Sequence, residues 1–252
     1  MTAAPRIRSI GPTGRPTCAL CGRQVGTAWK VYKDGRVTCS HHRRTVHCTW
    51  CGFPASFTLD DYRYCHDCRS RTVTTASRIA ELGELIKGSL RPRSCWLSDR
   101  VTLLVHSRDS LTKAGTNEPH LLGRSEAVFQ GSRLAHQTIW VRYGLPEEVC
   151  LTTLTHEYAH ALLNHHGRSR LTETQREGFC EYLAGVVVRE QLGHSKAAIN
   201  HYDTEFSRSD LYGRGMRLVT EAVRRNGEAT VIRAFLTGKI VELRLPSRDE
   251  SP

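Results

Sequence analysis

The sequence lacks a long apolar segment. Among its 252 residues, no hydrophobic run approaches the roughly 20 residues that a membrane-spanning helix requires. Residues 1–17 also lack the apolar core of a secretory signal peptide, because they are basic and rich in Pro, Gly, Ser and Thr. These absences argue against a membrane protein and against a secreted, disulfide-linked domain. They favour a cytoplasmic protein that uses its cysteines to bind metal.

Positive charge is concentrated toward the N-terminus. Residues 1–100 contain 17 Lys and Arg against 7 Asp and Glu, a net charge of +10, whereas the remaining residues have 19 against 18, a net charge of +1. A basic N-terminal region could bind an acidic protein or nucleic acid. Solvated arginine side chains on a small domain are the simpler interpretation, so the charge alone assigns no partner.

Metal chemistry is indicated most clearly by the motif H-E-x-x-H. His156 and His160 are four positions apart, so on a helix they share a face and can bind one metal ion. Glu157 falls on the neighbouring face, where it can act on a water that the metal activates. The apolar pattern of residues 149–164 predicts the helix that this geometry needs. The motif is typical of zinc peptidases, with the glutamate as general base, and two incidental histidines on a surface helix are the alternative.

The third metal ligand is argued by elimination. His166 occupies the place of the third histidine in H-E-x-x-H-x-x-G-x-x-H, but that pattern needs a glycine where this sequence has Leu163. Glu177 is the better candidate, because a capping-box pattern at Thr172 predicts a second helix that returns antiparallel to the first. Glu181, one turn further on, is expected to accept a hydrogen bond from the outer ring nitrogen of a ligating histidine. A solvated pair of acidic residues is the alternative.

These residues predict a catalytic zinc site with two histidines, one glutamate and a water. Glu157 would take a proton from the water and pass it to the leaving amine. The tetrahedral intermediate also needs a hydrogen-bond donor, for which Tyr212 is the first candidate and His201 and Tyr202 are weaker ones. A tyrosine followed by glycines could equally belong to a packed turn.

Residues 18–68 contain 7 of the 10 cysteines. Their spacing is C-x2-C-x17-C-x2-H, then a five-residue linker, then C-x2-C-x13-C-x2-C. Each half supplies four ligands for tetrahedral zinc: Cys18, Cys21, Cys39 and His42 for one ion, and Cys48, Cys51, Cys65 and Cys68 for the other. His41 could replace His42. We expect both zinc ions to be structural, because every coordination position is filled and so small a unit has little core.

Several motifs together resemble a known family. They are Cys39-x-x-His42 with the five-residue spacer, Tyr64-Cys65-x-x-Cys68, Tyr143-Gly144-Leu145-Pro146, Leu154-Thr155-His156-Glu157-x-x-His160-Ala161, Glu177-Gly178-Phe179-Cys180 and Tyr212-Gly213-x-Gly215-x-Arg217. The sequence is similar to the plant ubiquitin-activated peptidases that limit organ size, over most of residues 18–238 and more loosely in 90–137. The resemblance implies a LIM-like zinc module joined to a gluzincin peptidase domain. It also implies His156, His160 and Glu177 as zinc ligands.

The chain departs from that family in three respects. The plant proteins carry ubiquitin-interacting helices and a further zinc finger upstream, whereas 17 residues precede Cys18 here, so activation by ubiquitin is not implied. Glu181 stands where the plant proteins have glutamine. The bias toward arginine, with 30 Arg and 6 Lys, is typical of a GC-rich bacterial genome, and a bacterial cell can lack ubiquitin.

The predicted fold class is α+β. We expect a disordered basic tail over residues 1–17, a LIM-like double zinc module over 18–72, a linking helix within 73–90, a mainly helical gluzincin domain with a small sheet over 91–243, and a loose tail over 244–252. Strands are expected at 101–106 and 138–142, the second as an edge strand that pairs with substrate, with hairpins or loops over 107–137. Further helices are expected at 196–206, 210–226 and 228–236. Cys95, Cys150 and Cys180 are left as buried thiols.

Two functions from different classes are compatible with the sequence. The first is a zinc endopeptidase whose LIM-like module binds substrate or restrains the site. The second is a zinc-module protein that binds proteins or nucleic acid and has a latent or inactive gluzincin domain. The intact Glu157 favours the peptidase, because a scaffold needs no base beside the metal. A SprT-like protease acting on DNA-bound proteins is a narrower alternative, but that fold takes a third histidine and carries its zinc ribbon after the protease domain.

Overall fold

The computed structural model describes residues 14–32, 35–42, 44–97, 101–106, 121–131, 133–166, 171–193, 206–240 and 243. These residues form two compact units, divided between Thr72 and Val73. The N-terminal unit contains both predicted cysteine clusters, and the C-terminal unit contains the H-E-x-x-H helix.

Two short hairpins, each followed by a short helix, make up the N-terminal unit. Strand β1 (Trp29–Val31) pairs antiparallel with β2 (Val37–Cys39), and β3 (Phe57–Leu59) pairs antiparallel with β4 (Tyr62–Tyr64). The 3-10 helix η1 (Ser40–His42) follows the first hairpin, and α1 (His66–Ser70) follows the second. The last two predicted ligands of each cluster therefore lie where a strand passes into a helix.

One three-stranded sheet, with strand order β5-β7-β6, belongs to the C-terminal unit. Strand β5 (Val101–His106) is parallel to β7 (Arg133–Arg142), and β6 (Gly123–Gln130) is antiparallel to β7. Because β7 is the central strand, the prediction of an edge strand at 138–142 is wrong. The edge strand that contacts the H-E-x-x-H helix is β6, which lies within the residues expected to form hairpins or loops.

The helices of the C-terminal unit agree closely with the sequence pattern. They are α2 (Ala76–Leu90), η2 (Arg91–Arg93), α4 (Glu147–His165), α5 (Glu173–Leu192), α7 (Leu211–Asn226) and α8 (Glu228–Thr237). The helices predicted at 149–164, from Thr172, and at 210–226 and 228–236 are thereby confirmed. Except for Phe206, the helix expected at 196–206 lies outside the described residues.

Side-chain caps explain where two of these helices begin. The predicted capping box is present at α5: the N–H of Gln175 donates to Thr172 Oγ1 at 3.3 Å, and the N–H of Thr172 donates to Gln175 Oε1 at 2.9 Å. Asp210 caps α7 by accepting from the Gly213 N–H at 3.2 Å. Helix α5 ends at Gly193, whose φ of 57° lies in the left-handed region that glycine adopts without strain.

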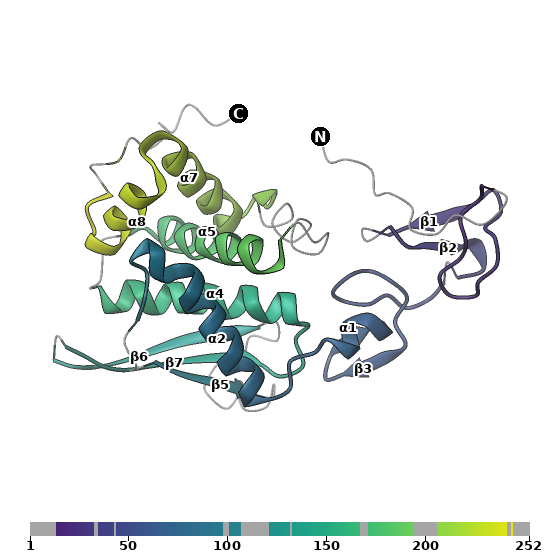
Figure 1. The fold of residues 1–252 in the computed structure, drawn as a ribbon, viewed down its shortest axis with the longest axis horizontal. Coiled ribbons are helices and arrows are strands. Elements are labelled where there is room, and N and C mark those ends of the chain that lie inside the picture. Colours follow the sequence, from purple (N-terminus) through teal and green to yellow (C-terminus); the bar gives the residue numbers. More distant parts are fainter. Residues whose placement is uncertain are drawn as a thin grey trace. The chain divides into compact units, whose positions relative to one another are not determined.

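Helix α4 lies between the sheet and α5, and α7 packs against α5 (Figure 1). Leu151 and Leu154 of α4 are fully buried, and Phe179 of α5 stacks on Phe235 of α8 with ring centroids 4.8 Å apart. Burying side chains of this size stabilises a fold by about 1.5–3 kcal/mol each, before entropy losses. The two central helices therefore hold the side chains that project from them on a well-packed frame.

The architecture as a whole mixes helices with small sheets, in agreement with the predicted α+β class. Among the described helices, none combines the length and the hydrophobicity that crossing a membrane demands. Residues 1–13 and 244–252, which cover most of the two predicted tails, lie outside the described residues.

Candidate metal centre

Helix α4 brings His156 and His160 together at the centre of the C-terminal unit. Their Nε2 atoms are 3.1 Å apart, and the two rings meet nearly edge to face. Both side chains are largely buried, with 13% and 18% of their surface exposed. Two ring nitrogens at this distance are stable only if a proton or a metal ion lies between them, because two lone pairs repel.

Glu177 of α5 completes a triangle with the two histidines. Its Oε2 atom is 3.1 Å from His156 Nε2 and 3.4 Å from His160 Nε2. A zinc ion binds such atoms at about 2.0–2.2 Å, and tetrahedral ligands are then separated by about 3.3–3.6 Å. The three atoms are close to this spacing, so the residues fit one zinc ion and leave a fourth position open.

Cys180 also lies within reach of the histidines and could be considered a ligand in place of Glu177. Its Sγ atom, however, contacts Nδ1 of His160 at 3.4 Å, on the other side of the ring from the Nε2 atom that meets Glu177. The two nitrogens of an imidazole point in diverging directions. Glu177, which meets both Nε2 atoms, is therefore the better third ligand.

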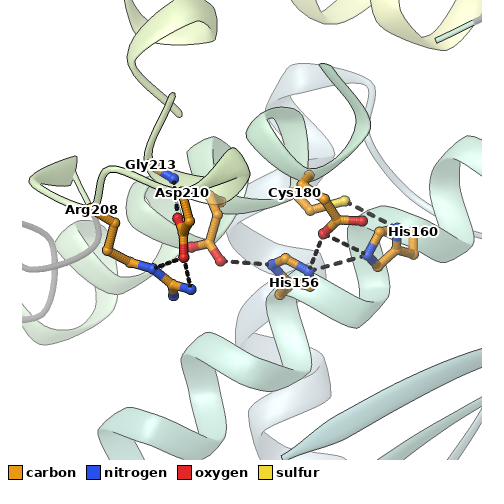
Figure 2. Close-up of polar contacts among 8 residues, drawn as sticks. His156, His160, Cys180, Arg208, Asp210 and Gly213 are labelled. Carbon is orange, nitrogen blue, oxygen red and sulfur yellow. Dashed lines mark hydrogen bonds and ion pairs between the residues drawn. The ribbon is translucent and has the colours of Figure 1, made fainter. Parts of the chain in front are cut away.

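The outer nitrogens of both histidines have partners on α5. Glu181 Oε1 lies 3.2 Å from His156 Nδ1, as the sequence argument expected, and Cys180 Sγ occupies the equivalent place at His160 (Figure 2). Burial opposes a positive charge on His156, but Glu177 and Glu181 outweigh it and raise the pKa of the metal-free imidazole to about 10. Burial also opposes the charge on Glu177 and so acts to raise the pKa of its carboxyl. Its hydrogen bonds to the two histidines outweigh this effect and lower that pKa to about 2.

Glu157 lies beside this triangle, next to the edge strand β6. Burial raises the pKa of its carboxyl, whereas the neighbouring histidines and the N–H of Ser125 act in the opposite direction. Gly123 of β6 leaves room for the side chain, because a Cβ atom there would lie 3.0 Å from Glu157 Cγ. A carboxyl with a raised pKa in a buried site is suited to accept and return a proton.

Tyr212 lies in the first turn of α7, with its ring centroid 6.2 Å from that of His156. The Arg208 guanidinium stacks over the tyrosine ring at 4.8 Å. The structure thus brings Tyr212 to the site, on a helix rather than in a turn between helices. His166 is exposed at the end of α4, and the weaker candidates His201 and Tyr202 lie outside the described residues.

Each half of the N-terminal unit gathers its four predicted ligands into one cluster: Cys18, Cys21, Cys39 and His42 in the first, and Cys48, Cys51, Cys65 and Cys68 in the second. The clusters share a local design, since the first pair of each is followed by a glycine with positive φ, Gly22 or Gly52. The N–H of that glycine donates to the carbonyl of the first cysteine, at 2.9 and 3.0 Å.

Sulfur distances in the clusters fit zinc and exclude disulfides. Cys21 and Cys39 have Sγ atoms 4.0 Å apart, and those of Cys51 and Cys65 are 3.6 Å apart. Thiolates on one tetrahedral zinc are separated by about 3.8 Å, whereas a disulfide needs about 2.05 Å. All 10 cysteines are free thiols.

The first cluster takes its histidine at position 42. His42 Nε2 is buried without a hydrogen-bond partner, as expected of an atom that binds metal, and it belongs to the cluster. His41 Nδ1 contacts Cys39 Sγ at 3.7 Å from outside that set. The structure therefore favours His42, the residue that the spacing predicts, over the alternative His41.

Comparison with known proteins yields one finding. A family model described as "DA1-like: Protein DA1" matches residues 94–210, which is less than half of the chain. The matched segment includes the H-E-x-x-H motif and Glu177, and it ends before Tyr212. The match supports a resemblance to DA1 proteins in the C-terminal unit. No curated protein and no solved structure matches the chain.

Proposed function

We propose that the chain is a zinc-dependent peptidase of the gluzincin type, with a LIM-like module that holds two structural zinc ions. The observation that carries the proposal is the convergence of His156 Nε2, His160 Nε2 and Glu177 Oε2 within 3.1–3.4 Å of one another. A structural zinc site has four protein ligands, whereas three ligands leave a position for water and substrate. The match to the DA1-like family over the same residues supports this assignment.

In the proposed reaction, a zinc ion held by the two histidines and Glu177 would polarise the scissile carbonyl and lower the pKa of the attacking water. Glu157 takes the proton of that water and returns it to the leaving amine. Burial equips Glu157 for this exchange, because it raises the carboxyl pKa. Tyr212, beside His156, is the proposed donor to the oxyanion of the tetrahedral intermediate.

We assign the peptide substrate to strand β6. Its Ser125 N–H reaches Glu157, so this side of the strand is directed away from β7 and toward the site. An extended peptide can add to the outer edge of a sheet through backbone hydrogen bonds, and such pairing is largely independent of side chains. A substrate strand beside β6 would place its backbone next to the general base.

The N-terminal unit is proposed to recognise a protein partner or a substrate. Its zinc ions would be structural, since four ligands close each cluster. Free thiols throughout the chain fit a reducing compartment such as the cytoplasm, where the substrates would be intracellular proteins.

The test compares new protein N-termini in cells that express the wild type, Glu157→Gln or Glu173→Gln. Glutamine keeps the size of residue 157 but cannot accept the proton, so the N-termini produced by the wild type should disappear. Glu173 is exposed on the first turn of α5, and its substitution is the matched control. All three proteins should be folded and loaded with zinc to the same extent.

Termini shared by the wild type and Glu173→Gln but absent with Glu157→Gln would establish the peptidase and identify its cleavage sites. Identical termini in all three strains, with zinc-loaded proteins, would contradict the proposal. They would favour a zinc-module binding protein, in which the basic N-terminal region would bind an acidic protein or nucleic acid.

A further inference from the structure

We propose that Cys180 is a positioning residue that holds the His160 ring in the tautomer needed to bind zinc. The inference rests on the proposed function, in which His160 is a zinc ligand. From the sequence, Cys180 is expected only to be a buried thiol. Cys180 would act through His160 and would touch neither metal nor substrate.

The geometry around the two histidines is nearly symmetrical. At His156, Nε2 faces Glu177 and Nδ1 faces Glu181 at 3.2 Å. At His160, Nε2 faces the same Glu177 oxygen and Nδ1 faces Cys180 Sγ at 3.4 Å. Figure 2 shows the contact between Cys180 and His160 as a dashed line. The thiol thus occupies the position that a carboxylate occupies at the other ring.

The direction of the hydrogen bond follows from the chemistry of imidazole. If His160 binds metal through Nε2, its proton must be on Nδ1, because a neutral ring carries one proton. That N–H then donates to Cys180 Sγ, which accepts it. The reverse arrangement, with the thiol donating to Nδ1, would place the ring proton on Nε2 and block the metal.

Water does not supply this contact, because Cys180 is fully buried, with 0% of its surface exposed. Without the sulfur, the Nδ1–H of His160 would lose this acceptor, and a buried polar group without an acceptor destabilises the arrangement that contains it. A weak acceptor such as sulfur recovers part of that cost and keeps the ring from rotating.

A neutral thiol also suits the charge of the site. Glu157, Glu177 and Glu181 already place three carboxyl groups around one divalent ion. A fourth carboxylate behind His160 would add unpaired negative charge to a buried region, which is costly. Cysteine provides an acceptor without adding that charge.

Helix α5 supplies all three groups from one face. Positions 177, 180 and 181 are separated by three and four residues, so one turn of the helix presents the ligand and both supporting side chains. A single rigid element therefore sets the orientation of both histidine rings.

The experiment measures the zinc affinity of the full-length protein by competition with a chelator. The zinc ion of the C-terminal unit is identified as the one that is lost in His156→Ala, and its affinity is compared among the variants. Cys180→Ala removes the acceptor, and Cys180→Ser restores a small one. Cys150→Ala is the matched control, because Cys150 is an equally buried thiol on α4. The second measurement is the exchange with water of the His160 Nδ1–H in the zinc-loaded protein, by proton–nitrogen NMR of the imidazole rings.

We expect Cys180→Ala to weaken zinc binding at this site about 10-fold and to speed exchange of the His160 ring proton, in line with the usual effect of removing a partner of a ligating histidine. Cys180→Ser should lie within about threefold of the wild type, and Cys150→Ala should change neither quantity. The inference would be overturned if Cys180→Ala kept the zinc affinity and the proton exchange rate of the wild type. It would also be overturned if Cys150→Ala lost as much zinc affinity as Cys180→Ala, or if Cys180→Ser did not recover the affinity. A wild type that binds no zinc at His156 would overturn both the inference and the proposed function.

Discussion

Arg36 connects the two halves of the N-terminal unit through one side chain. It belongs to the first half, but its guanidinium donates to Asp67 at 2.6 Å and to Cys51 Sγ at 3.7 Å, and it stacks on Phe53 at 3.6 Å, all in the second half. A zinc ion with four thiolates carries a net charge of −2, so a cation that donates to one sulfur stabilises the cluster.

We expect Arg36→Ala to destabilise the N-terminal unit by about 1–2 kcal/mol, since it removes a stacked cation and a charge-assisted hydrogen bond. Arg36→Lys should recover part of this, because a lysine keeps the charge without the planar fork. Chemical denaturation of the zinc-loaded protein, followed by release of zinc to a colorimetric chelator, measures the effect. Equal midpoints for the wild type and Arg36→Ala would show that the contact contributes nothing.

His156 should couple zinc binding to pH in the C-terminal unit. Glu177 and Glu181 outweigh the effect of burial and raise the pKa of metal-free His156 to about 10, so the ring carries an extra proton at neutral pH. Zinc must displace that proton. Zinc affinity should therefore fall as the pH is lowered, by about tenfold per unit well below this pKa, and calorimetry in buffers of different ionisation enthalpy should detect proton release. An affinity that does not vary between pH 6 and 9 would contradict this prediction.

At this scale the sequence was informative where spacing alone determines geometry. His156, His160 and Glu177 could be placed together because helix periodicity and a short turn set their positions. The spacing pointed to His42 but did not exclude a swap with His41, because the backbone after Cys39 decides which ring faces the cluster. The role of Cys180 was missed, although its position three residues after Glu177 placed it on the same helix face.

Helices α5 and α7 cross at a pair of glycines. A Cβ atom on Gly215 would overlap the carbonyl oxygen of Thr174 and lie 2.7 Å from Gly178 Cα. The two backbones can approach closely only because neither position has a side chain. This close crossing brings Tyr212 of α7 toward the histidines of α4, across from Glu177 of α5.

Gly215→Ala should therefore destabilise the C-terminal unit by about 1–3 kcal/mol, because the helices must move apart to admit the methyl group. The matched control is Gly88→Ala on α2, where a Cβ atom meets nothing within 4 Å. That change should leave stability equal or raise it by up to about 1 kcal/mol, since alanine favours a helix. Urea denaturation of the three proteins compares them. A Gly215→Ala midpoint no lower than that of Gly88→Ala would refute the role of the crossing.

The elements themselves were predictable to different degrees. Helix α4 follows from its apolar pattern and from Pro146 just before its first turn, and α5 follows from its capping box; these are local properties. A hairpin was one of the two expectations for residues 107–137, but the bounds of strand β6 were not predicted, because Arg124, Ser125 and Glu126 give it no apolar alternation. It is held by its pairing with β7 in a hairpin, where Gln130 lies opposite Arg133, so the partner strand and not its own apolar pattern defines it.

Across the whole molecule, the two units differ in what stabilises them. In the first half of the N-terminal unit, the buried hydrophobic group consists of Cys18, Val25, Val37 and Cys39, so two of its four members are themselves predicted zinc ligands. The described strands of that unit are only three residues long. The C-terminal unit instead buries long apolar helix faces that include no ligand, such as Leu151 and Phe179.

Removal of zinc should therefore unfold one unit and not the other. We expect a strong chelator to abolish the hydrogen-exchange protection of β1 to β4, because without metal the remaining apolar contacts of the N-terminal unit cannot offset the entropy of folding. Helices α4 and α5 should keep most of their protection, since their packing does not depend on the metal. Mass spectrometry of peptides from the full-length protein, with and without chelator, separates the two units in one experiment. Persistent protection of β1 to β4 after complete loss of zinc would show that the two N-terminal clusters are not structural metal sites. Loss of protection in α4 would show that the zinc ion proposed for the C-terminal unit also supports the fold.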